Sequence, residues 1–148
     1  MEKMRAARMV DVGRMVCEEI EIPPIDDGQV LIESEMASIC GSDLHLVMMG
    51  AGLNHPFPCP HGYPGHEGIG RIVESKAAGL EEGQQVLTFP NPVVGECFNE
   101  YQRVGASYCV PLPECELPRS YLLMAQQLGT VIYLSLIHIS EPTRRTPI

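Results

Sequence analysis

The chain has 148 residues, about the size of one domain, and a net charge of −9 from 19 acidic and 10 basic residues. This acidic balance disfavours binding to nucleic acid, and the chain has no uninterrupted run of about 18 apolar residues that would predict a membrane-spanning helix. A hydrophobic content of 45% argues against disorder, and 14 Gly and 13 Pro favour a turn-rich, mainly β domain over a helix bundle.

The N-terminal residues run directly into mixed sequence, without the apolar segment of a secretory signal. The six cysteines are irregularly spaced and include no C-x-x-C pair, so metal ligands or packed thiols are expected before disulfides. We therefore expect a cytoplasmic protein with reduced cysteines.

A series of short strands is predicted by apolar segments that end at Gly, Pro or Asp residues. They cover residues 5–12, 15–22, 29–36, 69–74, 86–89, 101–104 and 108–112. Short strands with such frequent turns indicate a small barrel or sandwich. Residues 40–68 are rich in Pro, Gly and His and are predicted as a long irregular stretch, which in a compact domain is usually functional.

A helix is predicted to begin near Pro118, with apolar residues at positions 122, 123, 125 and 128 on one face. From Leu134 onward the sequence resembles the translation of a transposase adapter used to build sequencing libraries. The predicted organisation is therefore an incomplete domain over residues 1–133 and a non-native tail over residues 134–148. An ordinary amphipathic terminus is the alternative for this tail.

Two short motifs contain residues that can bind a transition metal. One is C-G-S-D-L-H at residues 40–45, which begins with Cys40, and the other is G-H-E-G-I-G at residues 65–70, which contains His66 and Glu67. Catalytic zinc takes three protein ligands of the Cys, His or carboxylate type and keeps a fourth position open. The alternative is that Cys40 is a buried thiol and His66 an unrelated surface histidine, since the two lie 26 residues apart.

Other residues of the first motif have chemistry that would support such a site. A metal-ligating histidine usually donates its second ring N–H to a fixed acceptor, and Asp43 is a candidate for that acceptor. Ser42 and His45 are candidates for carrying a proton from a buried centre to water.

The order of these segments resembles the medium-chain dehydrogenase/reductase superfamily. A strand, C-G-S-D-x-H, a Pro- and His-rich loop, G-H-E-G-x-G and another strand follow one another, and the resemblance covers residues 4–112 and extends more weakly to residue 133. It implies a mainly β, GroES-like barrel with a few helices. It also implies a zinc-dependent oxidoreductase that transfers hydride between an alcohol, polyol or carbonyl substrate and NAD or NADP, from a homo-oligomeric parent enzyme.

The resemblance also implies a role for each residue of the two motifs. Cys40 and His66 would bind one catalytic zinc ion, and Glu67 would be an occasional ligand or catalytic carboxylate. Asp43 would be the hydrogen-bond partner of His66. Ser42 and His45 would form the proton relay of the catalytic site.

The sequence departs from the family pattern in three respects. Cys97, Cys109 and Cys115 are too scattered for the four-cysteine structural zinc site that many members have. The family's third catalytic ligand falls on Gln126, whose neutral amide is a weak zinc ligand. No G-x-G-x-x-G follows a strand, so the Rossmann domain that would bind the nicotinamide cofactor is absent from this sequence.

Two other functions remain as alternatives. The chain could be a non-catalytic metal-binding or interaction domain, inactive in isolation, because catalysis requires a cofactor site that it lacks. A zinc-free quinone reductase of the same superfamily is disfavoured because both Cys40 and His66 are present.

Overall fold

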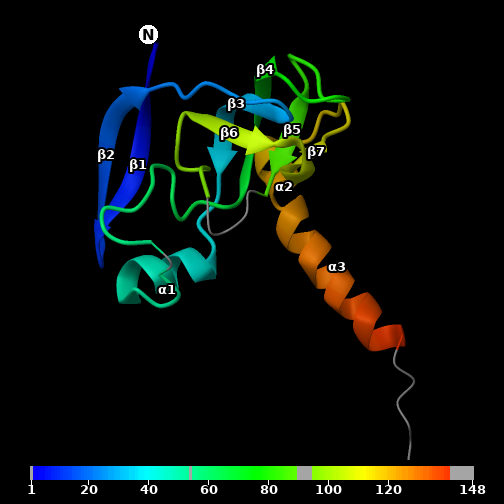
Figure 1. Ribbon diagram of the computed structural model, residues 1–148. Coiled ribbons are helices and arrows are strands. Elements are labelled where there is room, and N and C mark those ends of the chain that lie inside the picture. The colour runs from blue at the N-terminus through cyan, green and yellow to red at the C-terminus, as the bar shows by residue number, and fades with distance from the viewer. Residues whose placement is uncertain (1, 54, 90–94, 141–148) are drawn as a thin grey trace, which may run out of the picture.

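The computed structural model describes residues 2–53, 55–89 and 95–140, with side chains as far as residue 137. Within these residues, strands β1 (Lys3–Asp11) and β2 (Arg14–Glu21) form an antiparallel hairpin. A second antiparallel sheet has the order β6-β3-β4-β5-β7. Its strands are β3 (Gln29–Ala37), β4 (Gly68–Ser75), β5 (Gln85–Thr88), β6 (Tyr101–Gly105) and β7 (Cys109–Pro111). Figure 1 shows this sheet beside the hairpin.

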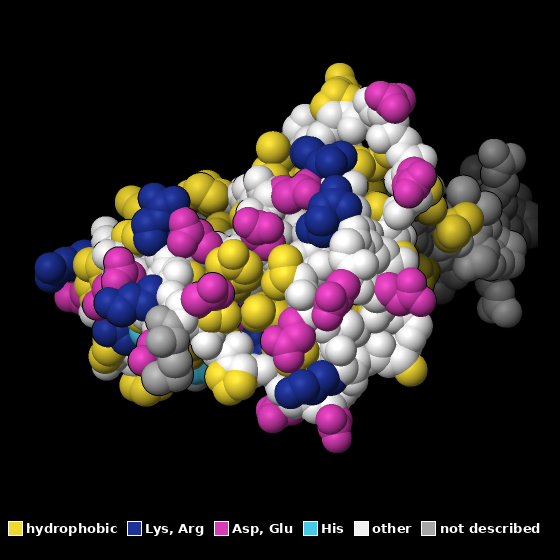
Figure 2. All heavy atoms as spheres, turned by 90° about the horizontal axis from the view of Figure 1, so that it is seen from above, with side chains coloured by type: hydrophobic (Ala, Val, Ile, Leu, Met, Phe, Trp, Pro, Cys, Tyr) yellow, Lys and Arg dark blue, Asp and Glu magenta, His cyan; other side chains and the backbone are white. Residues whose placement is uncertain are grey.

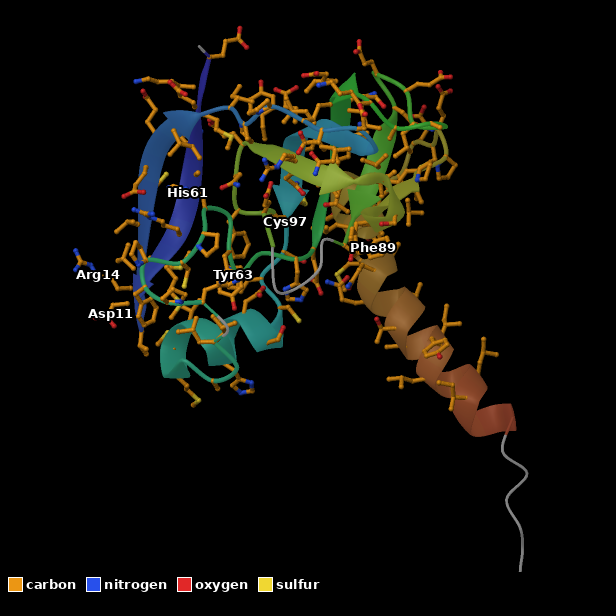
Figure 3. The ribbon with its side chains drawn as sticks, in the orientation of Figure 1. Asp11, Arg14, His61, Tyr63, Phe89 and Cys97 are labelled. Carbon is orange, nitrogen blue, oxygen red and sulfur yellow. The ribbon has the colours of Figure 1, made fainter. Side chains whose placement is uncertain are left out.

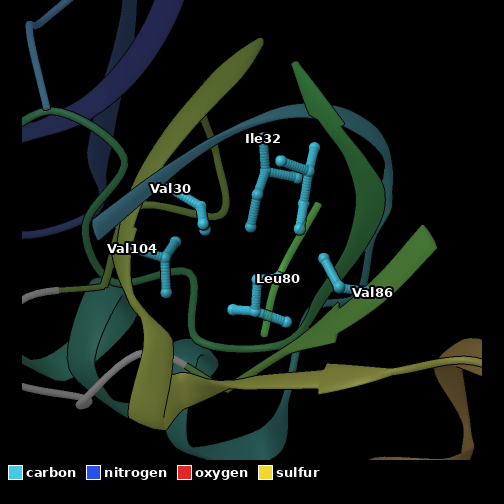
Figure 4. Packing of buried hydrophobic residues seen from close by; sticks show 6 residues of the cluster. Val30, Ile32, Leu80, Val86 and Val104 are labelled. Carbon is cyan, nitrogen blue, oxygen red and sulfur yellow. The ribbon is translucent and has the colours of Figure 1, made fainter. Parts of the chain in front are cut away.

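The larger sheet curls around an apolar core. Val30 and Ile32, two residues apart on β3, point to the same face, because successive side chains on a strand alternate between faces. They pack with residues of β4, β5, β6 and the turn after β4, and Figure 4 shows these side chains converging. The complete buried cluster is Val30, Ile32, Ile72, Leu80, Val86 and Val104. This mainly β, curled sheet with few helices confirms the fold predicted from the sequence.

Helix α1 (Gly41–Met49) lies at the lower end of the hairpin in Figure 1, below the larger sheet. The backbone N–H of Gly13, in the hairpin turn, donates to the carbonyl of Val47 at 2.6 Å. Buried Met9, Cys59 and Tyr63 pack together nearby. Figure 3 shows Tyr63 in the loop that follows α1 in the chain, beside the hairpin and above the helix. Arg14 and Asp11 mark the end of the hairpin in the same view. These contacts fix the hairpin to the helix that follows Cys40.

The prediction that residues 40–68 are irregular is wrong for α1. This helix forms because the carboxylate of Asp43 accepts a hydrogen bond from the backbone N–H of Cys40 at 2.8 Å and so caps its first turn. Gly50 ends it with a φ of 66°, the left-handed conformation that commonly terminates helices. All seven predicted strands are present with shifts of at most two residues at their ends, and Tyr108 lies in a short 3₁₀ helix (Ala106–Tyr108) instead of a strand.

Helices α2 (Arg119–Leu123) and α3 (Ala125–Ser140) follow the sheet. Leu122 and Leu123 of α2 are buried against Ile69 and Leu87, whereas α3 projects away from the sheet in Figure 1 and exposes its apolar residues. The helical segment Arg119–Ile137 has 19 residues and is long and apolar enough to cross a membrane, by length and composition alone. The expectation that no segment could span a membrane rested on uninterrupted apolar runs, and polar residues such as Gln126, Gln127 and Thr130 interrupt this one.

Charged side chains of both signs are interspersed on the face seen in Figure 2. Several charged side chains of the protein form ion pairs between segments, such as Arg5 with Glu100 and Lys3 with Glu19, both at 2.6 Å. Exposed pairs of this kind contribute little to stability, about 0–1 kcal/mol each. The fold therefore depends on its apolar clusters more than on these ion pairs.

The six cysteines are free thiols in very different surroundings, and we expect them to react at very different rates. Cys17 and Cys115 are exposed, whereas Cys97 is 2% exposed and burial raises its pKa to about 12. Because the thiolate is the reactive form, native protein at pH 8 should alkylate at Cys17 and Cys115 on the order of 100-fold faster than at Cys97. Peptide mass spectrometry after timed iodoacetamide treatment measures the rates, and a urea-denatured sample is the control. Equal rates in the native protein would contradict the buried position of Cys97.

Candidate metal centre

The two motifs meet because strands β3 and β4 are neighbours in the sheet. Ala37, the last residue of β3, pairs with Gly68, the first residue of β4. Beyond this pair, the backbone N–H of Ser38 donates to the carbonyl of Glu67 at 3.1 Å. Cys40 lies two residues after Ser38, and His66 directly precedes Glu67, so the strand register brings them together across 26 residues of sequence.

Cys40, His66 and Glu67 form a cluster of three possible metal ligands. One ligand atom from each residue lies within 4.8 Å of the others. Glu67 is 2% exposed, whereas Cys40 and His66 are partly buried. The thiol, imidazole and carboxylate therefore lie close enough together to approach one ion.

Asp43 fixes the orientation of His66. Its Oδ1 lies 3.0 Å from Nδ1 of His66, and its Oδ2 accepts the N–H of Cys40. The hydrogen bond with Asp43 is the largest influence that raises the pKa of His66 to about 9, while burial acts in the opposite direction. Because Nδ1 faces Asp43 and the carbonyl of Pro64, Nε2 is the ring nitrogen on the side of Glu67, 4.0 Å from its Oε1. The predicted partnership of Asp43 and His66 is thus present in the structure.

Glu67 is contacted by two residues that lie outside the predicted site. Its Oε2 accepts hydrogen bonds from Oγ of Ser38 and from Nε2 of Gln127, which is on α3. The position expected for a third ligand is Gln126, but the structure brings the adjacent Gln127 to Glu67. Neighbouring residues on a helix point about 100° apart, so a shift of one residue decides which side chain reaches the centre.

Ser42 and His45 lie on α1, close after Cys40 in the chain, and both are exposed. They are three residues apart, which makes them neighbours on the helix surface. Their exposure is compatible with contact to water, and their part in a proton relay stays a prediction. Cys97, Cys109 and Cys115 lie before β6, in β7 and after β7, respectively.

The sequence and the fold both match known proteins. The family model described as the alcohol dehydrogenase GroES-like domain matches residues 26–114. An NAD-dependent alcohol dehydrogenase of Sulfurisphaera tokodaii is 32% identical over 128 residues, which cover 78% of this chain and 33% of that protein. The 5-exo-hydroxycamphor dehydrogenase of Pseudomonas putida is 42% identical over 105 residues, with 66% of this chain and 28% of that protein covered.

Among solved structures, L-idonate 5-dehydrogenase from Escherichia coli has the same fold. The TM-score is 0.68 at 24% sequence identity, with 84% of this chain and 43% of that chain covered. The chain spans about a third of the length of the first of these curated relatives.

Proposed function

Because this chain belongs to the alcohol dehydrogenase GroES-like domain family, we propose that it is the metal-binding part of a zinc-dependent dehydrogenase. The whole enzyme would transfer hydride between an alcohol or polyol and NAD or NADP. The observation that carries this proposal is the meeting of Cys40, His66 and Glu67 in one partly buried cluster. The names of the relatives, which include alcohol and sugar-acid dehydrogenases, support the same reaction class.

The donor set fits zinc. A thiolate, an imidazole and a carboxylate are all common zinc ligands, and three protein ligands leave a fourth position for water or substrate. The ligand atoms lie within 4.8 Å of one another, a spacing that one ion with bonds of about 2.0–2.3 Å can bridge after small side-chain shifts. The hydrogen bond from His66 to Asp43 is the outer contact that metal-ligating histidines usually make.

The residues around the centre would divide the chemistry between them. Cys40, His66 and Glu67 would hold the ion, which when bound supplies a Lewis acid that polarises the substrate oxygen. Asp43 keeps the ring of His66 turned so that Nε2 faces Glu67. Ser42 and His45, exposed on α1, would carry the hydroxyl proton from the substrate to water.

Hydride transfer would need a part of the enzyme that this sequence does not supply. No G-x-G-x-x-G motif is present to seat the pyrophosphate of NAD or NADP on a helix N-terminus. Holding two reactants in place can account for about 7–11 kcal/mol of a barrier. We therefore expect the isolated chain to bind zinc without having dehydrogenase activity.

The proposal is tested by measuring zinc affinity and hydride transfer on the purified chain. We expect about one zinc ion per chain and no reduction of NAD or NADP with secondary alcohols or polyols. Losing contacts outside the ligand shell costs about 10–100-fold in metal affinity, so Cys40→Ser, which removes a ligand, should cost at least about 100-fold. Cys115→Ser, which changes an exposed cysteine away from the cluster, is the matched control.

Three results would count against parts of the proposal. Equal zinc affinity in the wild-type chain and Cys40→Ser would reject the metal centre. Zinc-dependent turnover that is lost in Cys40→Ser would reject the expected inactivity and leave the centre in place. The chain could also bind zinc and show no turnover even after the remainder of the enzyme is added. That result would favour the alternative of a non-catalytic metal-binding domain.

A further inference from the structure

Glu67 is held by two side chains that come from other parts of the chain. Ser38 follows β3, and Gln127 lies in the first turn of α3. The Oγ of Ser38 and the Nε2 of Gln127 both donate to Oε2 of Glu67, and Nε2 of Gln127 also donates to Oγ of Ser38 at 3.3 Å. The three side chains thus form a closed triangle of hydrogen bonds.

This triangle acts on one oxygen of the carboxylate only. Oε2 accepts the two hydrogen bonds, whereas Oε1 is the oxygen that lies 4.0 Å from Nε2 of His66. A free carboxylate rotates readily and can present either oxygen. Here, two donors on Oε2 restrict that rotation and leave Oε1 on the side of His66, one of the other two possible ligands.

We propose that Gln127, together with Ser38, is a positioning residue that turns Oε1 of Glu67 toward the ion and makes Glu67 the third metal ligand of this chain. The inference rests on the proposed function, because it presumes that Cys40 and His66 bind zinc. It assigns a task to the start of α3 that differs from direct ligation by Gln126. Gln127 acts through Glu67 and does not itself bind the ion.

The chemistry of glutamine suits this task. Its amide donates to Oε2 without adding a charge that would compete for the carboxylate. Glu67 is 2% exposed, so donors from the protein must replace the water that its buried oxygen loses. Oε1 of Gln127 is itself buried and has no hydrogen-bond partner among the described residues, so the contacts that hold this amide are those of its Nε2.

The packing of α2 explains why Gln127 can reach Glu67. Leu122 and Leu123 are buried against Ile69 of β4, the strand that begins directly after Glu67. This contact anchors the start of α3 beside the metal centre. A change at Gln127 therefore alters the centre while the apolar contact of α2 remains.

The test compares Gln127→Met with Gln126→Met in the full chain. Methionine keeps the length of the side chain and removes the amide donor. We expect Gln127→Met to lower the zinc affinity, measured by competition with a chelator, by about 10–100-fold. Ser38→Ala should lower the zinc affinity as well. Gln126→Met should bind zinc as the wild-type chain does.

Cobalt(II) absorption separates positioning from a loss of folding. In the cobalt-loaded chain, Gln127→Met should change the d–d bands, which depend on the ligand geometry, and keep the thiolate charge-transfer band of Cys40. Unchanged d–d bands and zinc affinity in Gln127→Met would overturn the inference, as would a larger loss in Gln126→Met. Cys40→Ser tests the metal centre independently. If the cobalt-loaded Cys40→Ser chain kept the thiolate charge-transfer band unchanged, the metal centre itself would be rejected.

Discussion

Replacing Gly62 with alanine should lower the free energy of unfolding by about 2–5 kcal/mol. Gly62 has a φ of +83°, which costs an L-residue about 1–2 kcal/mol. An added Cβ would also lie 2.5 Å from the Cα of Glu96, and relieving such overlap in a packed interior typically costs about 1–3 kcal/mol. The backbone of Gly62 also connects β1 to the loop between α1 and β4, because its N–H donates to the carbonyl of Ala7 at 2.6 Å. Urea denaturation followed by circular dichroism measures the change.

Gly28→Ala is the control for the backbone conformation alone. Gly28 has a φ of +79°, but a Cβ at this position would meet no atom within 4 Å. Its substitution should therefore cost only the conformational part, about 1–2 kcal/mol. Equal losses in the two variants would show that the close approach of Gly62 to Glu96 does not occur in the protein.

Replacing Asp43 with alanine should weaken both the fold and the metal centre. The 2% exposed carboxylate accepts the N–H of Cys40, a capping contact worth about 0.5–2 kcal/mol, and pairs with His66 in a charged hydrogen bond worth about 1.5–3 kcal/mol. We expect the free energy of unfolding to fall by about 2–5 kcal/mol. Zinc affinity should fall about 10–100-fold, because the ring of His66 loses its fixed partner.

Asp27→Ala is the matched control, since it removes the same charge from an exposed turn. Denaturation and chelator competition on both variants separate the local contact from the change in net charge. If Asp27→Ala lowered zinc affinity as much as Asp43→Ala, the effect would be one of overall charge. The contacts of Asp43 with Cys40 and His66 would then have no special part in binding.

The strands and the core could be predicted from the sequence because their signal is local. Val30, Ile32 and Val86 stand in apolar segments bounded by turn residues, and each is buried in the structure. The two motifs could be singled out because their order resembles the medium-chain dehydrogenase/reductase pattern. From the residue types alone, a buried thiol at Cys40 and an unrelated surface histidine at His66 stayed an alternative. Bringing them together required only that the flanking strands pair.

Helix α1 and the role of Gln127 are not marked by an apolar pattern in the sequence. Helix α1 has nine residues and exposes most of its apolar side chains, including Leu44, Met48 and Met49, so no apolar face marks it in the sequence. Its capping contact depends on Asp43, which the sequence motif indicates only as a partner of His66. The choice of Gln127 over Gln126 depends on how α2 packs against the sheet, and no pattern within α3 contains that information.

The pairing of Ala37 with Gly68 makes the separation of Cys40 and His66 independent of how many residues connect them. Insertions between Gly50 and Cys59 would lengthen the loop that connects the two motifs. The free-energy cost of closing a flexible loop rises by only about 0.6 kcal/mol for each doubling of its length. A deletion of one residue inside β4 would instead exchange the two faces of the strand and draw His66 away from its partners. Variation in loop length can thus remodel the surroundings of the metal centre while the ligand geometry is preserved.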